Sequence, residues 1–255
     1  MRDIGLALRQ VRYENRAFWR NPPAAFFTFA FPLLFMVVFN VIFDGASAGY
    51  GGFPASDFFT PALIVFSVIT ATYTNIAMTV SIARDNGVLK RVRGTPLPAW
   101  AYLFGRIAHA VLIALLLVAI VAAFGALVYG VSFPWERIGQ LLLTLGIAAA
   151  SFCALGLAVS ALMPNADAAP AIVNATILPL LFISNVFIRI EDPPAWIDLL
   201  AGVFPVRPFA DAMLAVYSPH LAGAGLDWRD LVVIGAWGLA GILFSLRFFS
   251  WEPRR

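Results

Sequence analysis

The residues best suited to specific contacts are concentrated in one short polar segment, residues 84–98, which reads RDNGVLKRVRGTPLP. Gly87 and the Gly94–Pro98 stretch are helix breakers, so they bracket a short helix between them. This helix carries an apolar patch beside a group of cations, a combination that can dock like a ball into the groove of a partner protein. The candidate contact residues are Arg84, Asp85, Gly87, Val88, Leu89, Lys90, Arg91, Val92 and Arg93.

Groups able to perform catalysis or bind a metal are sparse in the rest of the sequence. His109 lies one helical turn after Arg106, and we interpret it as hydrogen-bonded to a neighbour while Arg106 reaches toward the membrane surface; binding of an anionic headgroup is the alternative. Cys153 lies in an apolar run and is interpreted as a core residue, and His220 is isolated. Because these groups form no constellation, no metal site is expected and an intramembrane enzyme is the least favoured class.

The sequence also bears on the energy supply. A phosphate-binding loop needs G-x-x-x-x-G-K-[ST], whereas the only lysine, Lys90, follows a leucine. We therefore expect no cofactor in this chain, and ATP would have to be hydrolysed, with Mg²⁺, by another polypeptide. An ion-coupled transporter or channel is the alternative, but such proteins usually place charged groups at mid-membrane at a cost of about 2.5–3.5 kcal/mol each. The middles of the apolar stretches contain no Asp, Glu, Lys or Arg.

Weakly polar and aromatic residues within the apolar stretches are the candidates for a substrate path. Such a mixture suits an amphipathic molecule. The same hydroxyl and amide groups also bind neighbouring membrane helices together, so both uses stay open. The candidates are Ser67, Thr70, Tyr73, Thr74, Asn75, Asn174, Phe182 and Ser184.

These residues must be positioned by membrane-spanning helices. The 255 residues are 61% hydrophobic and 12% charged, with a mean hydropathy of +0.86, far from the composition of soluble domains. A helix needs about 20 apolar residues to cross a bilayer, which predicts an all-α polytopic membrane protein with six transmembrane helices in residues 23–250. The expected spans are Ala24–Phe43, Phe58–Ile82, Ala101–Tyr129, Ile138–Met163, Ala168–Ile188 and Leu231–Ser250, of which the third and fourth are overlong.

The connections between these spans predict an orientation. Lys and Arg are retained on the cytoplasmic side, and they crowd into the first 20 residues, the connection 83–100 and the tail 251–255. The connection Asp44–Asp57 has no cation. Both termini are therefore expected in the cytoplasm, with the protein in the cell membrane. The basic residues sit at membrane edges, which favours lipid headgroups or a cytoplasmic partner over nucleic acid.

Residues 1–22 are expected to form an amphipathic helix on the inner membrane surface. Ile4, Leu8, Val11 and Phe18 fall on one side of a helical projection. An ordinary basic flank that only sets topology is the alternative. The sequence also imitates a secretory signal ending at Ala46-Ser47-Ala48, but its apolar run is too long for one. The arginines that cluster on the opposite side are Arg2, Arg9, Arg16 and Arg20.

The longest connection, residues 189–229, is expected outside the cell as short re-entrant helices. Asp192 could cap a helix opened by Pro193. Pro208 could open a second helix that ends at Tyr217. An ordinary loop with turn prolines is the alternative.

At Arg84–Leu97 the chain resembles the permease subunits of type-2 ABC exporters, whose first intracellular loop commonly reads R-[DE]-x-G-x-L-K-R-[LV]-R-x-T-P-L. The stretch Asn174–Met213, with its Pro179–Phe187 and Phe204–Phe209 runs, is similar to the family's fifth helix and external re-entrant pair. A departure is Arg189-Ile190, where family members often place a proline, and it leaves the exit of the fifth span open.

The resemblance implies a function. Family members pair as two permeases with two ATPase subunits, to which they present the first intracellular loop and the N-terminal helix. It implies that Val88, Leu89 and Val92 enter the ATPase groove while Arg84, Lys90, Arg91 and Arg93 steer the contact. The favoured function is therefore the permease subunit of an exporter for a drug, lipid or glycolipid-like molecule, bound to an ABC ATPase, a second permease copy or paralogue, and membrane lipids.

Overall fold

The computed structural model describes residues 2–43, 53–95, 97–187, 194–218, 220 and 226–251, apart from the side chains of Arg2, Arg93 and Ala99. Every regular element in these residues is a helix. Within the described residues, five helices are long and apolar enough to cross a membrane by length and composition, and a bent pair of shorter helices could form a sixth span. These findings confirm the prediction of an all-α polytopic membrane protein.

In the described residues, long helices alternate with shorter helical elements. Their bounds are α1 Arg2–Trp19, α2 Pro22–Phe43, α3 Ala55–Ile69, the π-helical η2 Thr70–Thr74, α4 Asn75–Asp85, α5 Val88–Arg93, α6 Ala99–Tyr129, the 3₁₀-helical η3 Trp135–Arg137, α7 Ile138–Leu162, α8 Ala169–Ile183, α9 Ala195–Val203, α10 Val206–Tyr217 and α12 Trp228–Phe248.

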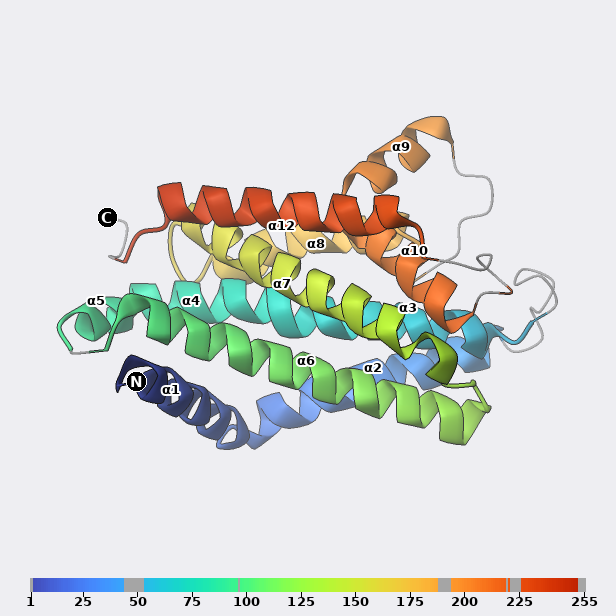
Figure 1. The fold of residues 1–255 in the computed structure, drawn as a ribbon, viewed down its shortest axis with the longest axis horizontal. Coiled ribbons are helices and arrows are strands. Elements are labelled where there is room, and N and C mark those ends of the chain that lie inside the picture. Colours follow the sequence, from blue (N-terminus) through green and yellow to red (C-terminus); the bar gives the residue numbers. More distant parts are fainter. Residues whose placement is uncertain are drawn as a thin grey trace.

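The long helices form an elongated bundle with two distinct ends (Figure 1). The start of α1, the helix α5 and the end of α12 lie at one end, here called the α5 end. Helix α9, the start of α3 and the α6–α7 connection lie toward the other, here called the α9 end. The 31 residues of α6 extend for about 46 Å, well beyond an apolar bilayer core of about 30 Å.

The second predicted span, Phe58–Ile82, is longer in the structure and contains a π-helical turn. Helices α3, η2 and α4 form one continuous apolar helix, Ala55–Asp85, at the centre of the bundle. Gly156 of α7 packs against the π-turn, where a Cβ atom would lie 2.7 Å from the carbonyl oxygen of Tyr73. The glycine therefore allows α7 to approach the backbone of the central helix closely.

The fifth predicted span, Ala168–Ile188, contains a shorter helix than expected. Helix α8 has only 15 residues and extends for about 22 Å, which is too short to cross a bilayer alone. It ends at Ile183 because Ser184 leaves the helical conformation and Asn185 has a φ of 56°, in the left-handed region. Ile188 lies outside the described residues.

Helices α9 and α10 follow as two short helices bent by 87° at their break. The second begins at Val206, two residues before Pro208, and ends at Tyr217 as expected. Arg207 joins the two helices, since its Nη1 lies 2.7 Å from Asp198 Oδ1 of α9 and its Nε lies 3.5 Å from Asp211 Oδ2 of α10. The proposed capping pair Asp192 and Pro193 lies outside the described residues.

Candidate functional site

The basic segment after the central helix forms the short helix α5 at the α5 end of the bundle (Figure 1). It follows a tight turn at Gly87, whose φ of 67° is one that side chains with a Cβ rarely adopt. Lys90 and Arg91 are exposed, while Val88 and Val92 are half-buried. The Arg91 guanidinium donates to the carbonyl oxygen of Asn86 at 3.3 Å. The cationic face of the predicted docking helix is therefore available to a partner.

Leu89 departs from the expectation that it enters a partner's groove. Its side chain is fully buried in an apolar cluster with Val80, Ala83, Tyr102 and Cys153. Val88 and Val92 pack against the same cluster. The apolar side of α5 is thus buried against side chains of α4 and α6, and this packing fixes α5 to both helices.

Arg84 also departs from its expected role of steering a partner. Only 1% of this residue is exposed, and its guanidinium donates to the carbonyl oxygens of Ser160 at 2.8 Å and Met163 at 2.5 Å. These carbonyls end helix α7, where the helix dipole favours a cation. Arg84 therefore joins α4 to the end of α7 and lies away from the surface.

Two neighbours of Arg84 strengthen this junction. Asp85 Oδ2 accepts a hydrogen bond from the backbone N–H of Ala166 at 3.0 Å, in the α7–α8 connection. The Ser81 hydroxyl lies 2.8 Å from the sulfur of Met163. We call these five residues, Ser81, Arg84, Asp85, Met163 and Ala166, the α4–α7 clamp. The clamp residues of α4 precede α5 in the chain, so the clamp connects the start of the basic helix to the segment between α7 and α8.

Helix α1 lies along the first half of α6 (Figure 1). Arg9, Arg16 and Arg20 are exposed, as their clustering predicted. Ile4 and Leu8, which the sequence placed on the apolar face of the predicted interfacial helix, are 62% and 61% exposed and are not covered by α6. The face that packs on α6 is rotated toward Ala7, Glu14 and Phe18, which recur at helical spacing and are buried or half-buried.

A polar contact holds α1 against α6. Glu14 Oε1 accepts a hydrogen bond from Gln10 Nε2 at 2.9 Å and forms an ion pair with Arg106 Nε at 3.4 Å. The Arg106 guanidinium also lies 5.0 Å from the centre of the Tyr102 ring. The Phe18 ring packs at 5.6 Å from His109. Arg106 is therefore paired with a carboxylate of α1, whereas the sequence predicted that it reaches the membrane surface.

A cavity of about 440 Å³ lies beside this contact, between α1, α2, the π-turn, α4 and α6. Thr70, Thr74 and Asn75 line it, so the structure brings together three of the predicted substrate-path residues. Glu14, Arg106 and His109 line it as well, and the rest of the wall is mainly apolar. This volume lies within the range of ligand pockets, about 300–1,000 Å³. We call this cavity the α1 pocket.

The other predicted path residues lie elsewhere. Ser67 is buried and donates to the carbonyl oxygen of Leu63 at 2.7 Å. The Tyr73 hydroxyl lies 2.6 Å from the Thr176 hydroxyl and so joins the π-turn to α8. On α8, Asn174 is exposed and Phe182 is 51% exposed. Ser184, the first residue after α8, is fully buried. The Tyr73 contact thus binds two helices together, which is one of the two uses that the sequence left open, whereas the Ser67 hydrogen bond stays within α3.

The comparison with known families agrees with this architecture. The family described as ABC-2 type transporter matches residues 9–217, which include α5, the clamp and the bent pair α9–α10. The chain belongs to the ABC-2 type transporter family. As an ABC-2 permease it is similar to the probable multidrug ABC transporter permease YbhR of Escherichia coli strain K12, with 28% identity over 191 residues. The protein of the same name from E. coli O157:H7 matches equally well.

The match to these relatives is partial. It covers 72% of this ABC-2 permease and 50% of each relative, so the chain spans about half the length of the curated relatives it matches.

Sequence reasoning missed several residues at the site of this ABC-2 permease. Glu14 is an acidic residue that the helical period places on the side of α1 opposite the arginines, and this placement was a signal in the sequence. Thr176 lies 103 positions from Tyr73, and no local pattern connects them. Met163 and Ala166 belong to a turn whose sequence has no charge pattern that points to Arg84.

Proposed function

We propose that this chain is the membrane-spanning permease subunit of an ATP-driven exporter in the cytoplasmic membrane. It acts with a separate ABC ATPase, which holds ATP and Mg²⁺, and with a second permease copy or paralogue. The α5 end faces the cytoplasm, where the ATPase binds. The observation that carries the proposal is the exposed pair Lys90 and Arg91 on α5, whose base is fastened by Leu89 and the α4–α7 clamp.

This arrangement explains how work could pass from the ATPase into the membrane. A docking helix can transmit a displacement only if it is firmly packed on the rest of the membrane domain. The buried side chains of Leu89 and Arg84 provide this packing. A displacement of α5 would therefore move the end of α7 and the start of α8. Exposed cations on α5 mainly set the rate and register of docking with an acidic partner surface.

The α1 pocket is the proposed first position of the substrate in the membrane domain. Its wall combines Met78 and Phe18 with the weakly polar Thr70, Thr74 and Asn75, which suits an amphipathic drug or lipid. The name of the E. coli relative supports a drug as the substrate class. The proposed substrate remains an amphipathic or hydrophobic molecule, including lipids and glycolipid-like molecules.

Charge reversal on α5 tests the ATPase contact. In a co-purification assay, the double substitution Lys90→Glu and Arg91→Glu should reduce recovery of the ATPase subunit at least tenfold while the permease remains in the membrane. Arg229→Glu, an exposed cation at the α9 end, is the control and should have no effect. Unchanged recovery with the double variant would contradict the docking role.

Cysteine labelling tests the orientation. With a membrane-impermeant maleimide on intact cells, Lys90→Cys should stay unlabelled until the membrane is opened, whereas Trp196→Cys in α9 should react at once. Cys153 is buried and gives little background. Immediate labelling at position 90 would place α5 outside the cell and overturn the proposal.

A further inference from the structure

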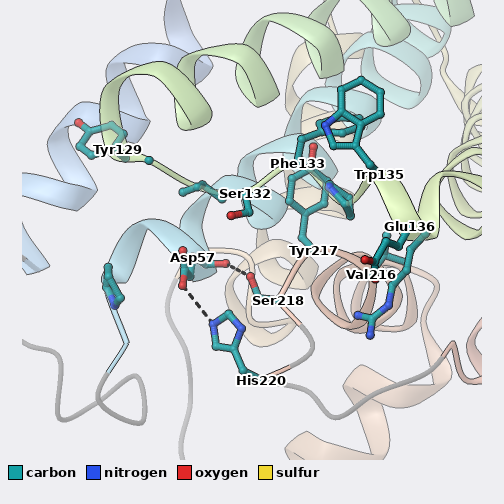
Figure 2. A pocket seen from close by; sticks show the side chains of 15 residues that line it. Asp57, Tyr129, Ser132, Phe133, Trp135, Glu136, Val216, Tyr217, Ser218 and His220 are labelled. Atoms are coloured by element: carbon teal, nitrogen blue, oxygen red, sulfur yellow. Dashed lines mark hydrogen bonds and ion pairs between the residues drawn. The ribbon is translucent and has the colours of Figure 1, made fainter.

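A second cavity, of about 580 Å³, opens at the α9 end (Figure 2). The α6–α7 connection, the start of α3 and the end of α10 enclose it. These three segments are distant in the sequence, so the tertiary fold alone creates the space. We call it the α9-end pocket. Its volume is within the range of small-molecule sites, about 300–1,000 Å³.

One wall of the α9-end pocket is held in place by two hydrogen bonds to Asp57. His220 Nε2 lies 3.1 Å from Asp57 Oδ2, and the Ser218 hydroxyl donates to the carbonyl oxygen of Asp57 at 2.6 Å. The ring of Phe53 packs 4.1 Å from the ring of His220. Figure 2 shows Asp57, Ser218 and His220 grouped together on this side.

The other wall presents groups from the α6–α7 connection. Glu136 is exposed, and Arg137 is half-buried with its Nη1 donating to the carbonyl oxygen of Ala215 at 3.2 Å. The hydroxyl-bearing Ser132 is exposed nearby. Hydrogen-bond acceptors, donors and a hydroxyl group therefore line the same cavity.

Aromatic rings complete the lining. Phe133 lies 4.6 Å from Trp135 and 6.1 Å from Tyr217, measured between ring centres. Trp135 is 75% exposed although it is the largest apolar side chain of the pocket. An exposed aromatic surface beside polar groups is suited to a ligand that has both C–H faces and hydroxyl groups.

The charge balance of the lining restricts the ligand. Asp57 and Glu136 are opposed by Arg137, and His220 adds a positive charge only when it is protonated. A phosphate or other anion would meet two carboxylates. An organic cation would be repelled by Arg137. Of the two carboxylates that could bind such a cation, Asp57 is already bonded to His220. A neutral ligand with several hydroxyl groups avoids both conflicts.

We propose that the α9-end pocket binds a neutral sugar residue, with Glu136 accepting hydroxyl hydrogen bonds and Trp135 stacking against the ring. The sugar is either free or the headgroup of a glycolipid. Leu127 and Val128, exposed by 86% and 56% near the end of α6, offer an apolar surface along which a lipid chain would extend. The proposal does not depend on the exporter function, because binding requires neither ATP nor an ATPase.

Binding to the purified full chain tests the proposal. The protein is placed in nanodiscs of phosphatidylethanolamine and phosphatidylglycerol, which contain neither sugar nor choline. Methyl β-glucoside, choline and inorganic phosphate are titrated separately, and retention of glucosyl-diacylglycerol is measured by native mass spectrometry. We expect saturable binding of the glucoside, of the glucolipid or of both. Binding of the glucolipid alone identifies a lipid headgroup as the ligand, and binding of the free glucoside identifies a soluble sugar.

Two variants locate the binding. Glu136→Gln and Trp135→Ala should each raise the Kd about tenfold, and both positions are exposed, so the fold should be retained. Trp196→Ala removes a tryptophan of α9 that is 68% exposed and lies outside the pocket, and it is the matched control. The proposal is overturned if only choline or phosphate saturates, if no sugar binds, or if the control variant weakens binding as much as the pocket variants do.

Discussion

The guanidinium of Arg84 lies 2.8 Å from the carbonyl oxygen of Ser160, although the two residues are 76 positions apart in the sequence. This contact joins the residue that precedes the basic helix to the end of α7. A buried cation that satisfies the last carbonyls of a helix is stabilised by both the hydrogen bonds and the helix dipole. The bond therefore links α4 directly to the end of α7, and α5 is connected to α7 through α4.

Removing this bond should destabilise the protein. Hydrogen bonds to charged groups contribute about 1.5–3 kcal/mol each, so Arg84→Ala should lower the free energy of unfolding by about 3 kcal/mol. Arg84→Lys should recover part of the loss because it restores the charge. Thermal unfolding in detergent measures both, with the exposed Arg91→Ala as control. An equal loss of unfolding free energy in the two alanine variants would show that the Arg84 hydrogen bonds do not stabilise the protein.

The contact between α1 and α6 should depend on Glu14. In Glu14→Ala, Arg106 loses its carboxylate partner while its side chain stays 14% exposed, so α1 should separate from α6 more often. Hydrogen exchange of residues 2–19 should then rise at least tenfold. Asp3→Asn, an exposed carboxylate on the same helix, is the control. Unchanged exchange in Glu14→Ala would mean that apolar packing alone holds the helix.

A methyl group at position 156 should be poorly tolerated. Its Cβ would lie 2.7 Å from the carbonyl oxygen of Tyr73, a backbone atom that cannot move aside easily, and overpacking of this kind costs about 1–3 kcal/mol. Gly146→Ala in the same helix meets nothing within 4 Å and should be neutral or slightly stabilising. Comparing the two melting temperatures separates the steric effect from the change in helix propensity. Identical melting temperatures would contradict the close approach.

The hydroxyl contact between Tyr73 and Thr176 should appear as a coupling energy. Tyr73→Phe and Thr176→Val each remove one partner of the 2.6 Å contact. If they act through that contact, the double variant should lose about 0.6–1.7 kcal/mol less than the sum of the two single variants. A double-mutant cycle on unfolding measures this difference. Additive losses would mean that the hydroxyls act independently.

The apolar spans were predictable because burial in a bilayer demands a long run of apolar residues, and this demand is local in the sequence. Five of the predicted spans correspond to long helices with ends shifted by a few residues; Pro22–Phe43, for example, extends the first by two. The helix within Ala168–Ile188 is shorter than predicted because the apolar run continues past Ile183, whereas the backbone turns at Asn185. A hydropathy pattern cannot detect this turn, because it depends on the backbone conformation of one residue.

The sequence by itself determined the class of the protein, the location of the basic helix α5 and the segregation of the arginines on α1. These properties depend on composition and on the 3.6-residue period, which neighbouring residues specify. Only the tertiary structure decided that Arg84 and Leu89 lie inside, that Glu14 pairs with Arg106, and that the three segments around Asp57, Glu136 and His220 enclose a pocket. Each of these contacts joins residues far apart in the chain. Whether such a side chain is buried or exposed depends on which residues surround it in the folded protein, and the local sequence does not specify these neighbours.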